Sequence, residues 1–124
     1  MRKMIDTTNI ETAYREAEVK SAVCIGLDYG FETTVRRSYR GTLVKLQHVH
    51  VDVVKGWDIQ EVVIQFLNEN NMNDNTKNKI RVFKENIDVK GEHPEREKEG
   101  EDIFDTWFDA LDHIMKLVWS IDNN

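Results

Sequence analysis

The strongest constraint on the fold of this chain is a run of apolar residues near its C-terminus that recur with helical spacing. The run consists of nine residues: Ile103, Phe104, Trp107, Phe108, Leu111, Ile114, Met115, Val118 and Ile121. A helix of that length extends roughly 30 Å, and its apolar face has to be buried against another element. The pattern predicts a long C-terminal helix that begins near Glu101 and lies on a sheet.

Other segments have the composition of β-strands. They are rich in β-branched or aromatic residues and are bounded by turn-forming residues, such as Gly30 and the pair Arg40-Gly41. The predicted strands are residues 21–27, 32–39, 42–54 and 79–89. The first three should form an antiparallel meander, because the turns between them are short.

Two shorter helices are also predicted. Residues 8–18 carry apolar side chains at helical spacing. Residues 58–68 do the same behind an Asp-x-x-Glu capping box formed by Asp58 and Glu61.

Together these segments predict a single α+β domain over residues 1–124. Its fold would be a twisted antiparallel sheet of about four strands, packed by the long C-terminal helix and one or two shorter helices. The asparagine-rich residues 68–78 and the charged residues 90–100 would connect these elements. A chain of 124 residues can bury one hydrophobic core without disulfides or a structural metal.

The sequence also bears on location. Its one cysteine, Cys24, has no partner for an intramolecular disulfide, and no apolar run has the length of a signal peptide core or of a membrane span. We therefore expect a cytoplasmic protein that does not contact a membrane.

Charge is unevenly distributed along the chain. Residues 92–112 hold nine acidic and only two basic residues, a net charge of −7, whereas the whole chain carries −6. On the predicted C-terminal helix, Asp102, Asp105, Asp109 and Asp112 would form a ridge of carboxylates along one face. Such a ridge is either a solvated surface or a site that binds the Arg and Lys side chains of a larger basic partner. The predicted partner-binding residues are Glu99, Glu101, Asp102, Asp105, Asp109 and Asp112.

This ridge cannot bind DNA or RNA directly, because affinity for nucleic acid comes from Lys and Arg side chains that replace counterions. Basic residues gather elsewhere, at Arg36, Arg37 and Arg40. These three are the predicted ligand-binding residues for a phosphate or a small anionic nucleotide. The alternative is an ordinary exposed hairpin.

A further candidate site is a strand of alternating polar residues and valines. His48, His50 and Asp52 are two residues apart, so strand geometry places them on one face. Two imidazoles and a carboxylate can form part of a zinc site, which Asp109 and His113 from the last helix could complete. In the alternative interpretation the valines face the core and the histidines face solvent.

No pattern typical of an enzyme is present, since the glycines lack the spacing of a phosphate-binding loop and Cys24 lies among apolar residues. In its length, and in its acidic residues from Glu99 to Asp112, the chain resembles the small acidic inhibitor proteins encoded by bacteriophages, anti-CRISPR proteins among them.

The resemblance implies a non-enzymatic protein that blocks the basic nucleic-acid-binding groove of a host complex. The alternatives are a zinc-binding or anion-binding module and a metal-dependent hydrolase. Leu117 and Trp119 could provide an apolar edge for a homodimer.

Overall fold

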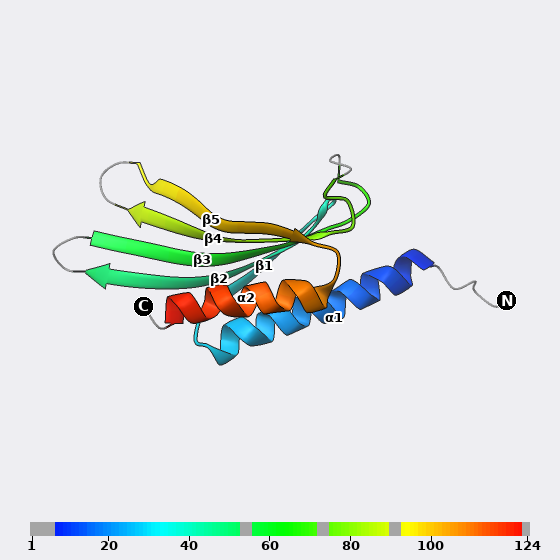
Figure 1. Cartoon of the computed structure of the whole chain (residues 1–124), viewed down its shortest axis with the longest axis horizontal. Helices are drawn as coiled ribbons and strands as arrows, with labels where there is room; N and C mark the ends of the chain where they lie inside the picture. The colour runs from blue at the N-terminus through cyan, green and yellow to red at the C-terminus, as the bar shows by residue number, and fades with distance from the viewer. Residues whose placement is uncertain (1–6, 53–55, 72–74, 90–92, 123–124) are drawn as a thin grey trace.

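The chain forms a five-stranded antiparallel sheet with two helices packed on it (Figure 1). The computed structural model describes residues 7–52, 56–71, 75–89 and 93–122, with side chains described from residue 15 and excluding 52, 56 and 57. The elements are α1 (Thr7–Asp28), β1 (Glu32–Ser38), β2 (Gly41–Asp52), β3 (Gly56–Leu67), β4 (Ile80–Val89), β5 (Glu95–Phe104) and α2 (Trp107–Asp122). The fold is therefore α+β, as predicted, with five strands where about four were expected.

The strands follow one another in the sheet in chain order, from β1 to β5. Both helices lie on the same face of the sheet in Figure 1. Helix α1 contacts β1, β2 and β3, whereas α2 contacts β3, β4 and β5. The sheet thus has a face covered by helices and an uncovered face.

The hydrophobic core lies between the helices and the covered face. In the antiparallel register, alternate residues of each central strand point toward the helices, such as Val44 and Leu46 in β2 opposite Ile64 and Val62 in β3. The buried cluster consists of Val19, Ala22, Phe31, Val44, Leu46, Val62, Ile64, Phe66, Ile80, Val82, Ala110, Ile114, Val118 and Ile121. Burial of these apolar side chains is the main stabilising contribution to the fold.

Helix α1 includes the helix predicted over residues 8–18 and continues through the segment where a strand was predicted, residues 21–27. The prediction of a strand at 21–27 was wrong, because Val19, Ala22 and Gly26 are buried at helical spacing on one side of α1. A Cβ atom on Gly26 would lie 2.6 Å from Cδ2 of Leu46, so a glycine allows the helix to approach β2 closely. A short apolar run does not distinguish a buried strand from a buried helix.

The predicted helix at 58–68 was also wrong, since these residues form the central strand β3. Both faces of β3 are buried near its middle, where Val62 and Ile64 face the helices while Glu61 and Val63 face the other way. When both faces are buried, apolar residues occupy neighbouring positions and reproduce helical spacing by coincidence. Asp58 and Glu61 therefore form no capping box.

Residues 95–104 form strand β5, although residues 90–100 were predicted to be a connector. The last helix begins at Trp107 and not near Glu101, with Thr106 at its N-terminus: the amide N of Asp109 donates to Oγ1 of Thr106 at 3.3 Å. Ile103 and Phe104 consequently belong to the sheet. On α2, Ala110, Ile114, Val118 and Ile121 are buried, whereas the side chain of Phe108 is 81% exposed.

The uncovered face carries its own apolar patch. Val63, Phe83 and Ile87 are at most 5% exposed there. Long polar side chains cover part of this patch, since Cζ of Arg81 lies 5.1 Å and Nζ of Lys98 lies 4.5 Å from the centre of the Phe83 ring. Figure 1 shows the sheet curving away from the helices at the end that holds the β1–β2 and β3–β4 connections.

In the described part of the chain, neither helix has the length and apolar character needed to cross a membrane.

Candidate functional site

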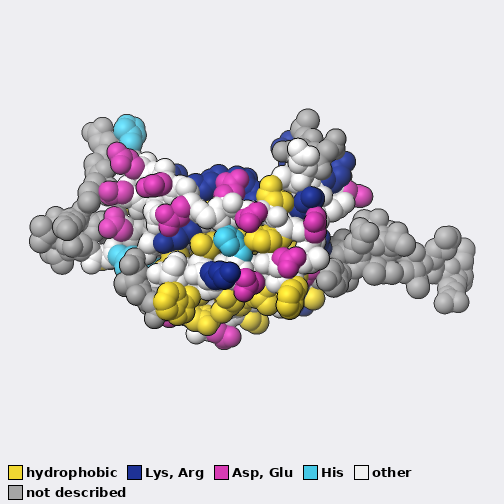
Figure 2. Space-filling view, viewed as in Figure 1, with side chains coloured by type: hydrophobic (Ala, Val, Ile, Leu, Met, Phe, Trp, Pro, Cys, Tyr) yellow, Lys and Arg dark blue, Asp and Glu magenta, His cyan; other side chains and the backbone are white. Residues whose placement is uncertain are grey.

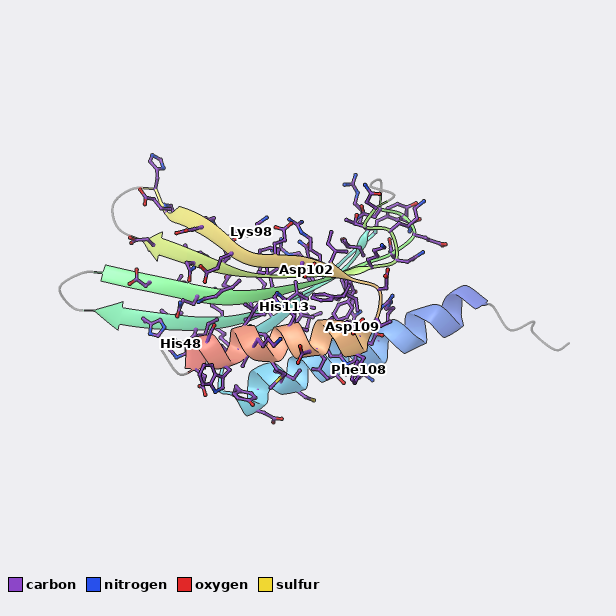
Figure 3. All side chains as sticks on the ribbon, in the orientation of Figure 1. His48, Lys98, Asp102, Phe108, Asp109 and His113 are labelled. Atoms are coloured by element: carbon purple, nitrogen blue, oxygen red, sulfur yellow. The ribbon has the colours of Figure 1, made fainter. Side chains whose placement is uncertain are left out.

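Acidic side chains form a band along β5 and the adjoining side of α2. We use the name acidic band for seven exposed residues: Glu95, Glu97, Glu99, Asp102, Asp105, Asp109 and Asp112. Figure 2 shows acidic side chains spread across this side of the molecule, and Figure 3 shows Asp102 on β5 above Asp109 on α2. The acidic residues thus share one surface, which two elements build.

The predicted ridge on a single helix was wrong. Only Asp109 and Asp112 lie on α2, whereas Asp102 lies in β5 and Asp105 in the turn that follows it. The register shift between Val82 and Lys84 places an extra residue at Gly100, whose φ is +65°. This bulge moves Asp102 to the helix-covered face, beside Glu99, and turns Glu101 to the uncovered face.

Glu101 is therefore not part of the acidic band. Its carboxylate pairs with Arg81 at 2.9 Å and with Lys98 at 3.5 Å on the uncovered face. Hydrogen bonding from Arg81 is the main cause that holds the pKa of Glu101 below its ordinary value of 4.5, and partial burial opposes it.

The carboxylates of the acidic band differ in how far they are neutralised. Glu99 pairs with the buried Lys84 at 3.1 Å, and Asp105 and Asp112 pair with Lys79 and Lys116. The remaining four form no ion pair with any residue that the structure describes: Glu95, Glu97, Asp102 and Asp109. The band therefore keeps a net negative charge that is available to a partner.

Glu95 and Glu97 were missing from the predicted set because their segment was expected to be a connector. Their signal is nevertheless present in the sequence, where Glu95, Glu97 and Glu99 alternate with Arg96 and Lys98. A strand turns alternate side chains to opposite faces, so this alternation places acidic residues on one face and basic residues on the other.

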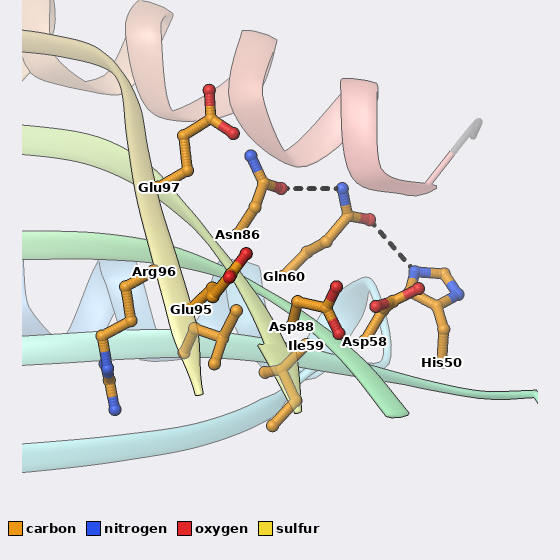
Figure 4. A pocket seen from close by; sticks show the side chains of 10 residues that line it. His50, Asp58, Ile59, Gln60, Asn86, Asp88, Glu95, Arg96 and Glu97 are labelled. Atoms are coloured by element: carbon orange, nitrogen blue, oxygen red, sulfur yellow. Dashed lines mark hydrogen bonds between the residues drawn. The ribbon is translucent and has the colours of Figure 1, made fainter. Parts of the chain in front are cut away.

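His48 and His50 lie together near the C-terminal end of β2, on the helix-covered face. Nδ1 of His48 lies 3.0 Å from Nε2 of His50, which lies 3.0 Å from Oε1 of Gln60, and Nε2 of Gln60 donates to Oδ1 of Asn86 at 3.1 Å. Figure 4 shows the part of this row that runs from His50 on β2 through Gln60 to Asn86 on β4. It borders a cavity of about 920 Å³ that carboxylates of Asp58, Asp88, Glu95 and Glu97 also line.

The alternative interpretation, in which the valines of this strand face the core and the histidines face solvent, was wrong. His48 and His50 share the face of Val44 and Leu46, and the His48 ring packs edge-on against Phe31 with ring centres 6.0 Å apart. Because Oε1 of Gln60 can only accept, its hydrogen bond with His50 uses the hydrogen on Nε2 of His50. That nitrogen then has no lone pair to accept from Nδ1 of His48, so the row does not form a continuous relay of hydrogen bonds.

The structure does not bring together all five residues of the predicted zinc site. His113 lies on α2, where its Nε2 contacts the carbonyl oxygen of Gly100 at 2.5 Å and its ring packs on Phe104. Asp109 lies one turn earlier on the same helix, and the side chain of Asp52 lies outside the described residues. Among the described residues, no three His, Cys, Asp or Glu side chains are arranged to hold a metal ion, and zinc binding stays a prediction.

The predicted arginine group is divided between the two faces of the sheet. Arg37 points to the helix-covered side and forms an ion pair with Glu16 of α1. Arg36 and Arg40 instead line a cavity of about 540 Å³ on the uncovered face, where Arg81 of β4 joins them. Sequence reasoning missed Arg81, because only the strand register brings β4 to this cavity.

Comparison with known protein families, with curated proteins and with solved structures found no match for this chain.

Proposed function

We propose that this protein is a non-enzymatic binding protein whose acidic band docks into the basic groove of a larger protein or nucleoprotein complex. The observation that carries the proposal is the contiguity of the band, in which Glu95, Glu97 and Asp102 lie exposed along one strand and form no ion pair with a described residue. Carboxylates on every second residue of a strand are roughly 7 Å apart. Such a line of negative charge is complementary to a groove that binds the phosphates of a nucleic acid.

The position of the band at the sheet edge supports binding through side chains. Strand β5 is an edge strand with charged residues on both faces. Charged side chains on an edge oppose the addition of another strand. The partner would therefore contact the carboxylates, and its affinity would depend on salt. In the setting that the phage inhibitors suggest, it would be a host complex that handles nucleic acid.

The test compares two triple variants of equal charge change. Glu95→Gln with Glu97→Gln and Asp102→Asn neutralises the band, whereas Asp28→Asn with Glu32→Gln and Glu69→Gln neutralises exposed acidic residues elsewhere. Each immobilised protein is incubated with bacterial lysate, and short duplex DNA is then used for elution. We expect the wild type and the control variant to release the same basic protein, and the band variant to retain none of it.

Binding should also weaken as salt rises above about 0.15 M, where the screening length falls below roughly 8 Å. The proposal fails if the band variant captures the same protein as the control, or if duplex DNA does not displace it.

A further inference from the structure

The cavity lined by Arg36, Arg40 and Arg81 on the uncovered face is a surface distinct from the acidic band. We call it the arginine cavity. It brings three basic side chains together in a chain whose net charge is −6. One register row crosses all five strands there: Arg36, Leu43, Gln65, Arg81 and Ile103. The two arginines of this row are three strand spacings apart, roughly 14 Å between backbones. Their long side chains can therefore converge on one small group above Leu43 and Gln65.

The cavity is lined by three arginines, Arg36, Arg40 and Arg81. The guanidinium group of Arg36 forms no ion pair or hydrogen bond with any described residue. Gln65 accepts from Nη1 of Arg81 at 3.3 Å, and its Nε2 group donates to no residue within the described ranges. Glu101 is the one carboxylate that lines the cavity among these residues, and it is held by Arg81 and Lys98.

Arg36 has no counter-charge among the described residues, and an anion held between Arg36 and Arg81 would supply one. We propose that this cavity binds a small organic phosphate monoester. A guanidinium group matches the oxygens of a phosphate with paired hydrogen bonds, and Arg36 and Arg81 can approach it from opposite sides. The apolar side chains of Leu43 and Ile103 would contact the organic part of the ligand, and the volume of about 540 Å³ is within the usual range for small-molecule sites.

The neighbouring residue Arg37 supplies a matched control, because it has the same charge but points to the opposite face of β1. Calorimetric titration with phenyl phosphate, inorganic phosphate, benzoate and benzyl alcohol separates the contributions of the phosphate and the ring. We expect phenyl phosphate to bind at least about tenfold more tightly than each of the other three. Arg36→Gln should weaken binding of phenyl phosphate about tenfold, as expected for loss of a charged hydrogen bond, whereas Arg37→Gln should change it less than about twofold.

A third variant should increase the affinity of the cavity for phosphate. Glu101→Gln removes the carboxylate that competes for Arg81, so the affinity for phenyl phosphate should rise about threefold or more. Circular dichroism confirms that each variant is folded. The proposal is overturned if Arg36→Gln and Arg37→Gln weaken binding equally, which would indicate attraction by net charge alone. It is also overturned if benzoate binds as tightly as phenyl phosphate, or if phenyl phosphate does not bind at all.

Discussion

Glu61 is a carboxylate on the uncovered face that is only 3% exposed. Its Oε1 accepts a hydrogen bond from Nε2 of Gln47 at 2.6 Å, whereas its Oε2 is buried and has no hydrogen-bond partner. A buried acceptor without a partner costs free energy, and a buried charge costs more. Glu61 thus lowers the stability of the sheet and depends on Gln47 for compensation.

We expect Gln47→Leu to lower the free energy of unfolding by about 1–3 kcal/mol, because it leaves the buried carboxylate without its donor. Replacing both partners, as Gln47→Leu with Glu61→Leu, should restore most of that loss, since no buried polar group remains. Urea unfolding of Gln47→Leu, Glu61→Leu and the double variant measures the coupling. If the double variant is as unstable as Gln47→Leu, the hydrogen bond is not the cause.

Glu101 should make stability depend on pH at acidic values. Because its folded pKa is below 4.5, the contribution of its ion pairs is complete above that pH and is lost as the pH falls through the lowered folded value. Glu101→Gln should therefore lower the free energy of unfolding at pH 7 by a few tenths to about 1 kcal/mol, and this difference should vanish at pH values below the folded pKa. Thermal melts across this range measure it, with Glu97→Gln, which removes no described ion pair, as the control that shows no such loss.

Within α2, buried and exposed apolar residues should behave differently. Ile114→Ala removes a fully buried side chain and should cost about 2–5 kcal/mol of unfolding free energy. Phe108→Ala, at a position 81% exposed, should change it by less than about 0.5 kcal/mol. Denaturant unfolding of both variants checks this contrast. A large cost for Phe108→Ala would mean that its ring is covered in solution.

Most of the elements that could be predicted from the sequence have one buried face. The hairpin of β1 and β2 and the buried stripe on α2 follow from simple periodicity, whereas β4, which is buried on both faces, was recognised from its β-branched and aromatic composition. Strand β3 could not be recognised in this way, because burial on both faces removes the alternation of polar and apolar residues.

The candidate sites show the same limit. The acidic residues were found from composition, but their shared surface depends on the bulge at Gly100 and on β5 lying next to α2. The pairing of Arg36 with Arg81 in one cavity depends on a register across four strands. Such long-range pairings are decided by packing between distant segments, which periodicity within one segment does not report.

In the whole molecule, acidic charge is concentrated on one surface. The acidic band occupies β5 and α2 on the helix-covered side, whereas on the uncovered face basic and acidic side chains nearly balance: Arg36, Lys45, Arg81, Arg96 and Lys98 lie there with Glu32, Glu61, Glu85 and Glu101. A protein with this distribution can present different electrostatic potentials to two ligands at once. The net charge of −6 therefore does not describe either surface.

The order of the strands has a consequence for how the chain folds during synthesis. Because every strand pairs with its neighbour in the sequence, each new strand can add to the growing sheet as soon as it leaves the ribosome. Contacts that are local in sequence favour rapid folding. Helix α2 is synthesised after all five strands, and until it docks, the core residues Ile64, Ile80 and Val82 lack their cover. Until α2 docks, these exposed apolar side chains can contact other chains and promote aggregation.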